Sequence, residues 1–314
     1  MEQQLETRAK PFLKWAGGKS QLIAEIEKRF PFRSDDRFTY VEPFVGGGAV
    51  LFWVLNNFPK IEKVVINDVN PDLVRTYEVI KNSPEDLVKR LTPWEKQYHK
   101  LTDDPETKRD FYYRKRKQFN RRPSNDPVTQ AALMIFLNKA GFNGLYRVNR
   151  SNGFNVPMGS YRKPLICNRE NLRAASKALK KVVVLNGDFE DTLSHAGAGD
   201  STFFYFDPPY KPLSSTANFN TYAKGGFDDD EQERLKNFCD RLHGKKYRWA
   251  LSNSDVKSAN PNNTFFDELY KDYSIERGWA KRSINSNPSK RGKLTELLIT
   301  NYDCDRQGSP LIHG

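Results

Sequence analysis

Short apolar runs alternate along the chain with longer segments in which apolar residues recur every three or four positions. The runs are residues 39–44, 62–67, 182–186, 202–206, 247–252 and 296–302. The runs are rich in β-branched and aromatic residues and predict strands. In the longer segments between them, the spacing of the apolar residues predicts helices. This alternation predicts an α/β fold.

Two of the runs, residues 182–185 and 203–206, are apolar at every position. A strand that is apolar throughout is typical of a largely parallel sheet, in which helices cover both faces. Ligands of such sheets bind beyond the carboxyl ends of the strands. The residues that follow each run are therefore the first candidates for a functional site.

The middle of the chain has a different pattern. Residues 84–175 begin with charged, helical stretches and continue into a segment rich in Gly, Asn and Arg at 138–164. We interpret this part as an insertion that divides the α/β domain. The predicted domains are a discontinuous catalytic domain of residues 11–80 and 177–302, an inserted domain of residues 81–176, and a tail of residues 303–314.

Inside the insertion, residues 145–150 and 153–158 flank Ser151 and Asn152. Two such segments around a short polar pair predict a β-hairpin with a tight turn.

Charge and composition restrict the partners. The chain has 51 Lys and Arg against 39 Asp and Glu, a net charge of +12. This charge suits binding to a polyanion but also serves ordinary solubility.

Three cysteines and four histidines lie far apart, so we expect no metal site and no disulfide framework. No apolar run approaches the roughly 20 residues of a membrane span, and we expect a cytoplasmic protein.

A glycine loop follows the first predicted strand. Residues 42–48 contain Gly46, Gly47 and Gly48, and Asp68 comes 20 residues later, after the second strand. Glycines let a backbone approach a ligand closely, and nucleotide-binding α/β folds place a ribose-binding carboxylate at this spacing. The pair predicts a nucleotide-like cofactor.

An upstream segment, residues 12–20, contains Gly-Lys-Ser and could be mistaken for a phosphate-binding loop. That motif needs a first glycine where Leu13 stands, so we reject this interpretation. From spacing alone, Trp15 is equally compatible with core packing, and Lys19 with a solvated helix charge.

The most specific signal is Asp207-Pro208-Pro209-Tyr210, directly after an apolar run. The amino group of a nucleobase is a poor nucleophile, and the Asp207 carboxylate and the Pro208 carbonyl are suited to accept hydrogen bonds from its protons. Consecutive prolines stiffen the turn, and Tyr210 offers a flat face for a base that has been flipped out of the duplex. The alternative is a plain strand-ending turn.

Together these motifs resemble the DNA adenine methylase (Dam) family of α-group, D12-class N6-adenine methyltransferases, from about residue 11 to residue 302. The matching elements follow the family's order: residues 12–19, the loop 42–48, Asp68, the inserted recognition region, Asp188-Phe189, and residues 207–210. The resemblance implies a Rossmann-like methyltransferase sheet with an inserted, mainly helical target-recognition domain that carries a β-hairpin.

The resemblance implies S-adenosylmethionine as cofactor and assigns residues to it. The expected cofactor-binding residues are Trp15, Lys19, Glu42, Phe44, Gly46, Gly48, Asp68, Asp188, Phe189 and Asp207. Among them Asp68 suits the ribose, Lys19 the methionine carboxylate, and Asp188 the position near the adenine ring.

The resemblance also implies double-stranded DNA as substrate, and relatives with this recognition segment generally recognise GATC. The expected DNA-binding residues are Lys14, Phe142, Asn143, Leu145, Arg147, Asn149, Pro157 and Arg162. Arg147 and Lys14 suit guanine, Leu145 and Pro157 the thymine methyl group, and Phe142 an intercalating ring.

One departure from the family is Ser160, where several relatives have an arginine for phosphate; Arg162 follows closely. An alternative role for Asn143, Arg147 and Asn149 is to brace the hairpin through local hydrogen bonds.

Two other functions stay open at this point. The same fold methylates cytosine N4, RNA or protein amides in related enzymes, which tend to have Ser or Asn in the place of Asp207. The other possibility is a sequence-specific DNA-binding protein on an inactive methyltransferase scaffold. We expect a monomeric, nucleoid-associated adenine methyltransferase and leave a pairing with a restriction endonuclease open.

Overall fold

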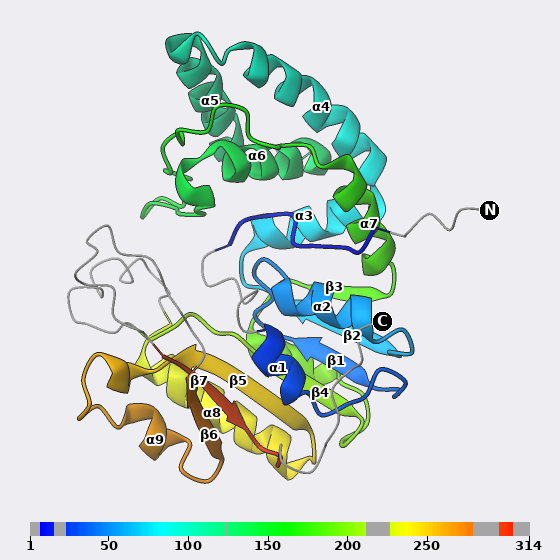
Figure 1. The fold of residues 1–314 in the computed structure, drawn as a ribbon, viewed down its shortest axis with the longest axis vertical. Coiled ribbons are helices and arrows are strands. Elements are labelled where there is room, and N and C mark those ends of the chain that lie inside the picture. Colours follow the sequence, from blue (N-terminus) through cyan, green and yellow to red (C-terminus); the bar gives the residue numbers. More distant parts are fainter. Residues whose placement is uncertain (1–6, 16–22, 123–124, 212–226, 279–294, 304–314) are drawn as a thin grey trace. The chain divides into compact units, whose positions relative to one another are not determined.

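The computed structural model describes residues 7–15, 23–122, 125–211, 227–278 and 295–303 (Figure 1). The chain divides into two compact units. The first comprises Met1–Gly18, Gly46–Asn57 and Asp68–Gly187, and the second comprises Lys19–Val45, Phe58–Asn67 and Asp188–Gly314. The first unit includes all of residues 81–176, the predicted inserted domain. The limits of the predicted domains stay a prediction.

The second unit contains a mixed β-sheet. Its strands are β1 (Thr39–Glu42), β2 (Lys63–Asn67), β4 (Thr202–Phe206), β5 (Arg248–Ser254), β6 (Ser274–Gly278) and β7 (Glu296–Thr300). They lie in the order β2-β1-β4-β5-β7-β6. The first four are parallel, whereas β7 is antiparallel to both β5 and β6. The predicted α/β fold is confirmed.

The core of this unit forms around β4, in which every residue is buried. The helices of the unit are α1 (Ile23–Lys28), η3 (Phe189–His195), α8 (Asp229–Gly244), η5 (Val256–Ser258) and α9 (Phe265–Leu269). Phe238 of α8 contacts Phe204 and Phe206 edge-on, at 6.2 and 6.0 Å between ring centroids. The prediction of a fully covered strand at 203–206 is therefore confirmed.

The first unit is helical. Its elements are α2 (Ala49–Asn57), α3 (Pro71–Asn82), α4 (Pro84–Lys100), α5 (Pro105–Asn120), α6 (Pro127–Ala140), η2 (Phe142–Gly144), α7 (Arg169–Leu179) and strand β3 (Val182–Leu185). Four of the helices begin with proline, whose fixed φ and missing N–H suit the first helical position. The side chains of Asn70, Asp104 and Asp126 cap three of these starts.

Helix α6 is the centre of this unit. It is buried around most of its circumference and packs against α3, α4 and α5, as Figure 1 shows. An apolar helix of this kind needs neighbours on several sides, which explains why charged helices surround it. Among the described residues, no helix combines the length and the apolar character that a membrane crossing requires.

One expectation about strands is wrong, and one strand was missed. In β3 only Val182 is buried and the three residues after it are half-exposed, so an apolar run there does not mean coverage on both faces. Strand β6 was not predicted, because its sequence Ser-Ile-Glu-Arg-Gly is short, polar and partly exposed at the end of the sheet.

The predicted hairpin is present as a tight turn with a very short ladder. Asn149 N–H donates to the Gly153 carbonyl at 2.9 Å, and Val148 and Phe154 form an isolated bridge. Asn152 adopts the left-handed conformation with φ 58°. Beyond the turn, Asn155 N–H donates to the Arg147 carbonyl at 3.1 Å, and the backbone N–H and carbonyl of Phe154 bond to the side chain of Asn120 in α5.

Candidate functional site

The glycine loop before α2 has a backbone that side chains would disturb. Gly46 and Gly48 have φ values of 48° and 74°, in the left-handed region. A Cβ atom on Gly48 would lie 2.4 Å from the Tyr77 hydroxyl oxygen, and that hydroxyl donates to the Gly46 carbonyl at 3.0 Å. Glycine is therefore required for both conformation and space.

Asp68 is fixed against this loop. Its Oδ2 atom accepts a hydrogen bond from Gly46 N–H at 3.1 Å, and its Oδ1 atom accepts one from Asn70 N–H at 2.9 Å. Burial raises the pKa of Asp68, and the two backbone hydrogen bonds act in the opposite direction. Each carboxylate oxygen has two lone pairs, so this group can accept further hydrogen bonds from the hydroxyls of a sugar.

Trp15 lies beside the same loop. Its indole stacks on Tyr146, with 5.6 Å between ring centroids and 25° between planes. Cβ atoms on Gly46 and Gly47 would approach the Trp15 side chain to 2.9 and 2.8 Å. Trp15 is half-buried, so part of its side chain is accessible. Lys19, the other predicted residue of this segment, lies outside the described residues.

The predicted catalytic turn follows β4 in the second unit. Asp207 and Tyr210 are half-buried, Pro208 is buried and Pro209 is exposed. The Tyr210 hydroxyl donates to Glu296 Oε2 at 2.9 Å. Burial, followed by the negative charges of Asp207 and Glu296, raises the pKa of Tyr210 well above its usual range, so the phenol stays protonated.

Carboxylates and phenols gather around this turn. Tyr40 donates to Glu42 Oε2 at 2.8 Å, and burial followed by the Glu42 charge raises the pKa of Tyr40. Burial and then the Asp207 charge raise the pKa of Tyr205. As neutral phenols, Tyr40 and Tyr210 therefore each donate a hydrogen bond to a carboxylate near the turn.

Asp188 and Phe189 form a second predicted part of the cofactor site. Asp188 caps η3, and its carboxylate accepts hydrogen bonds from Arg234 at 3.2 and 2.6 Å and from Glu190 N–H at 2.9 Å. Burial acts to raise the pKa of Asp188, but the Arg234 guanidinium outweighs it and the pKa is lowered. Phe44 lies 5.4 Å from Phe189 between ring centroids.

The recognition segment contains both exposed and braced side chains. Phe142 is 50% exposed, and Asn143, Pro157 and Arg162 are exposed as well, while Leu145 is half-buried. An exposed phenylalanine beside the hairpin is available to insert into a base stack.

Two of the residues with an expected DNA contact also make local hydrogen bonds that brace the hairpin. Arg147 Nε donates to Asn155 Oδ1 at 2.7 Å. Asn149 Oδ1 accepts hydrogen bonds from the backbone N–H groups of Ser151 and Gly153, at 3.0 and 2.8 Å. These bonds fix the shape of the turn. Contact of Arg147 and Asn149 with DNA stays a prediction.

Two lysines near the recognition segment carry charge. Lys14 is exposed, and Asn138 holds its backbone N–H and carbonyl through bonds of 2.8 Å each. Burial and the nearby Lys14 charge lower the pKa of Lys139 to about 8. Arg162 forms an exposed ion pair with Asp103 at 3.1 Å, of the kind that contributes little to stability.

Sequence reasoning missed several residues around the turn and around Asp188. Glu296, Gln232, Asn253 and Arg234 lie in β7, α8 and β5, far along the chain from their partners. Glu296 begins an apolar run and Gln232 lies in an amphipathic helix, so only their burial marks them as unusual.

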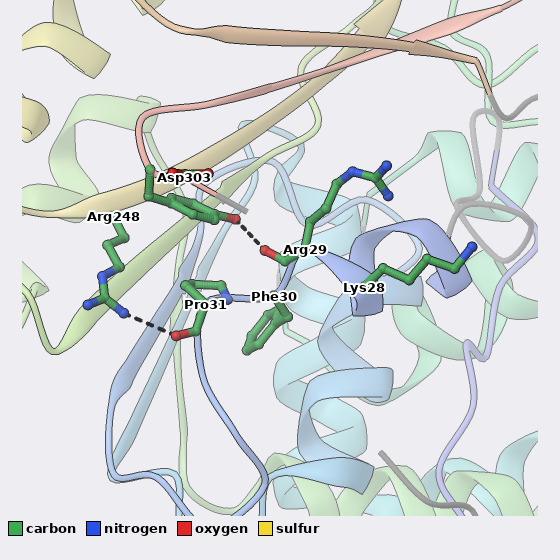
Figure 2. Close-up of a pocket in the computed structure, with 7 residues that line it drawn as sticks. Lys28, Arg29, Phe30, Pro31, Arg248 and Asp303 are labelled. Atoms are coloured by element: carbon green, nitrogen blue, oxygen red, sulfur yellow. Dashed lines mark hydrogen bonds between the residues drawn. The ribbon is translucent and has the colours of Figure 1, made fainter. Parts of the chain in front are cut away.

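A pocket elsewhere in the second unit does not involve the predicted residues. It is lined by Lys28, Arg29, Phe30, Pro31, Arg248, Tyr302 and Asp303 (Figure 2). The Arg248 guanidinium in this pocket donates to the Pro31 carbonyl at 3.0 Å and so joins two parts of the fold.

In the part of the chain that the structure describes, no cluster of three or more His, Cys, Asp or Glu could hold a metal ion.

Comparisons with known proteins agree on one family. Residues 15–284 match the model of the D12 class N6 adenine-specific DNA methyltransferases. The chain is 44% identical to Type II methyltransferase M.MjaIII of Methanocaldococcus jannaschii, over 93% of this chain and 99% of the relative. It is 36% identical to DNA adenine methylase of Haemophilus influenzae, over 92% of each chain. For DNA adenine methylase of Escherichia coli (strain K12), the identity is 34% over 91% of this chain and 93% of the relative.

Proposed function

Because the chain belongs to the D12 class of N6 adenine-specific DNA methyltransferases, we propose that it methylates the N6 atom of adenine in duplex DNA with S-adenosylmethionine as methyl donor. The target adenine is flipped out of the duplex, since its amino group cannot be reached inside the base stack. Direct in-line transfer needs no covalent enzyme intermediate, so positioning and electrostatics supply the acceleration.

The observation that carries this proposal is the turn at residues 207–210. The Asp207 carboxylate and the Pro208 carbonyl accept hydrogen bonds from the two amino protons of adenine, which localises the nitrogen lone pair. Tyr210 provides the face on which the flipped base stacks, and its hydrogen bond to Glu296 restricts rotation of the ring.

The residues around the glycine loop suit S-adenosylmethionine. Asp68 accepts from ribose hydroxyls, and the glycines at 46 and 48 allow the loop to pack closely against Trp15 and Tyr77 beside it. When bound, S-adenosylmethionine supplies an electrophilic methyl group on a sulfonium. Phe44 and Phe189 offer aromatic surface for an adenine ring, and Asp188 accepts from its amino group.

We further propose GATC as the recognition site. Arg147 and Lys14 donate to guanine, Leu145 and Pro157 contact the thymine methyl group, and Phe142 fills the space that the flipped base leaves. Asn143, Asn149 and Arg162 contribute polar and phosphate contacts. The net charge of +12 supports binding to a duplex.

We propose that the protein acts as a monomer on chromosomal DNA in the nucleoid. Two of the relatives are named Type II methyltransferases, M.MjaIII and, in Lactococcus lactis, M1.LlaDCHI. Their names support a functional pairing with a restriction endonuclease as one context for this chain.

The decisive experiment compares Asp207→Ala with wild type and with Asp230→Ala, an exposed control in α8. Plasmid DNA is treated with each protein and S-adenosylmethionine, digested to nucleosides and analysed by mass spectrometry. Wild type and Asp230→Ala are expected to give N6-methyladenine, and Asp207→Ala none, with duplex binding retained. N4-methylcytosine in place of N6-methyladenine would reject the proposal.

The recognition sequence is tested on the same DNA by single-molecule sequencing, which reports the modified base and its position. Methylation confined to GATC is the expected result. Modification at another sequence would reject the proposed role of the recognition segment while leaving the chemistry intact.

A further inference from the structure

Two buried amides connect the backbone on either side of Tyr210. Gln232 Nε2 in α8 donates to the Pro209 carbonyl at 3.3 Å. Asn253 Oδ1 in β5 accepts from Lys211 N–H at 3.2 Å. The two side chains are themselves joined, because Asn253 Nδ2 donates to Gln232 Oε1 at 3.2 Å. The chain of bonds therefore closes a loop that spans the Tyr210 backbone.

The polarity of this chain is fixed at both ends. A backbone N–H can only donate and a carbonyl can only accept, so Lys211 orients the Asn253 amide and Pro209 orients the Gln232 amide. If either amide were flipped, two donors or two acceptors would face each other. Since both ends are backbone groups, one orientation of the pair satisfies all three bonds.

Both amides are fully buried, with 0% exposure of Gln232 and of Asn253. Glutamine and asparagine are mostly exposed in proteins, and a buried polar group is costly unless it is hydrogen-bonded. Neither side chain caps a helix. Their bonds instead converge on the turn, where Ser254 Oγ also donates to the Lys211 carbonyl at 2.7 Å.

The bonds also select which carbonyl of the turn is available. Pro208 and Pro209 have no N–H to donate, and the carbonyls of Pro209 and Lys211 are occupied. Among the described residues, none donates to the Pro208 carbonyl. The amide pair thus holds the turn so that the Pro208 carbonyl is left for an incoming amino group.

We propose that Gln232 and Asn253 are positioning residues, which fix the Pro208 carbonyl and the Tyr210 ring relative to the target base. The proposal rests on the function proposed above. It predicts that disturbing the amide pair lowers kcat far more than it weakens DNA binding, because both amides are fully buried and bonded to the turn.

The test uses Gln232→Glu, in which a carboxylate oxygen faces the Pro209 carbonyl oxygen and repels it. At pH 8 we expect kcat to fall about 10- to 100-fold, as for a small displacement of a catalytic group. The dissociation constant for a GATC duplex should change less than about threefold, because binding energy from the phosphates is untouched. With 2-aminopurine at the target position, the fluorescence on binding should differ from that of wild type.

The pH profile separates positioning from a merely structural role. Burial raises the pKa of a carboxyl group, so the introduced acid should protonate within an accessible range and then donate to the Pro209 carbonyl. The ratio of kcat between Gln232→Glu and wild type is therefore expected to recover as pH falls from 8 to 6. A ratio that stays constant, or a kcat within about threefold of wild type at pH 8, would overturn the proposal.

Gln232→Met covers the case in which Gln232→Glu does not fold, because methionine keeps the volume without a charge. We expect it to lower kcat with no recovery at low pH, and an unchanged kcat would count against positioning. Wild-type enzyme serves as the reference for the proposed function. If wild type itself forms no N6-methyladenine, that function fails, whereas active wild type with fully active variants refutes only the amide pair.

Discussion

Asp72 connects the start of α3 to the recognition segment, and its neutralisation should destabilise the protein. Its carboxylate is 1% exposed. Oδ1 accepts from Arg75 at 3.2 Å, and Oδ2 accepts from the Tyr146 hydroxyl and from Arg122, each at 3.0 Å. Tyr146 in turn stacks on Trp15. One buried carboxylate therefore anchors the segment that carries the predicted base contacts.

In Asp72→Asn, an amide nitrogen would face two donors at the position of Oδ2. Flipping the amide moves the clash to Arg75, so no orientation satisfies all three donors. Losing a charged acceptor and leaving a buried donor unpaired costs about 2–4 kcal/mol. At about 2 °C per kcal/mol for a chain of this size, the thermal midpoint should fall by about 4–8 °C.

The assay is thermal unfolding by circular dichroism, with Asp110→Asn on the exposed face of α5 as the matched control. That control should stay within about 0.5 kcal/mol of wild type. Tyr146→Phe removes one of the donors at Oδ2, so the double variant with Asp72→Asn should lose about 1 kcal/mol less than the sum of the single losses. A midpoint within about 1 °C of wild type for Asp72→Asn, or strict additivity, would refute the reasoning.

Two further predictions concern charge. Arg234→Ala removes the guanidinium partner of Asp188. Calorimetry should then show S-adenosylhomocysteine binding about fivefold more weakly. The effect is modest because the ion pair between Arg234 and Asp188 is partly exposed. An unchanged affinity would remove Asp188 from the cofactor site. Lys139→Met should raise the thermal midpoint at pH 7, because burial lowers the pKa of Lys139 to about 8 and the folded protein holds a costly charge. The gain should shrink as pH rises from 8 to 10, where the amine is neutral in the folded state; a gain that grows with pH would contradict this sign.

The sequence determined the elements near the functional motifs. Residues 202–206 are strand β4 as predicted, because an unbroken apolar run between turn residues has few alternatives. The starts of α5 and α6 are also determined locally, because an aspartate that caps the helix stands beside a proline that suits the first helical position. The family could also be inferred from sequence, since its motifs lie in loops where residue type follows chemistry.

The sequence was less informative where an element lacks an apolar signal. Strand β6 pairs through its backbone with β7, and all of its residues are partly or fully exposed. Backbone pairing of this kind depends on the neighbour and not on local propensity. The side chain of Asn120 in α5 bonds to the backbone of Phe154 in the hairpin, a contact across 34 positions that no local pattern predicts.

Only the tertiary structure decided which distant side chains meet. Tyr210 and Glu296 are 86 positions apart, and Asp72 and Tyr146 are 74 apart, yet each pair shares a hydrogen bond. A local pattern encodes whether a residue is buried and in which element, because propensity and burial act over a few residues. The partner of a buried polar group depends on the order of strands and the packing of helices, which no single segment specifies.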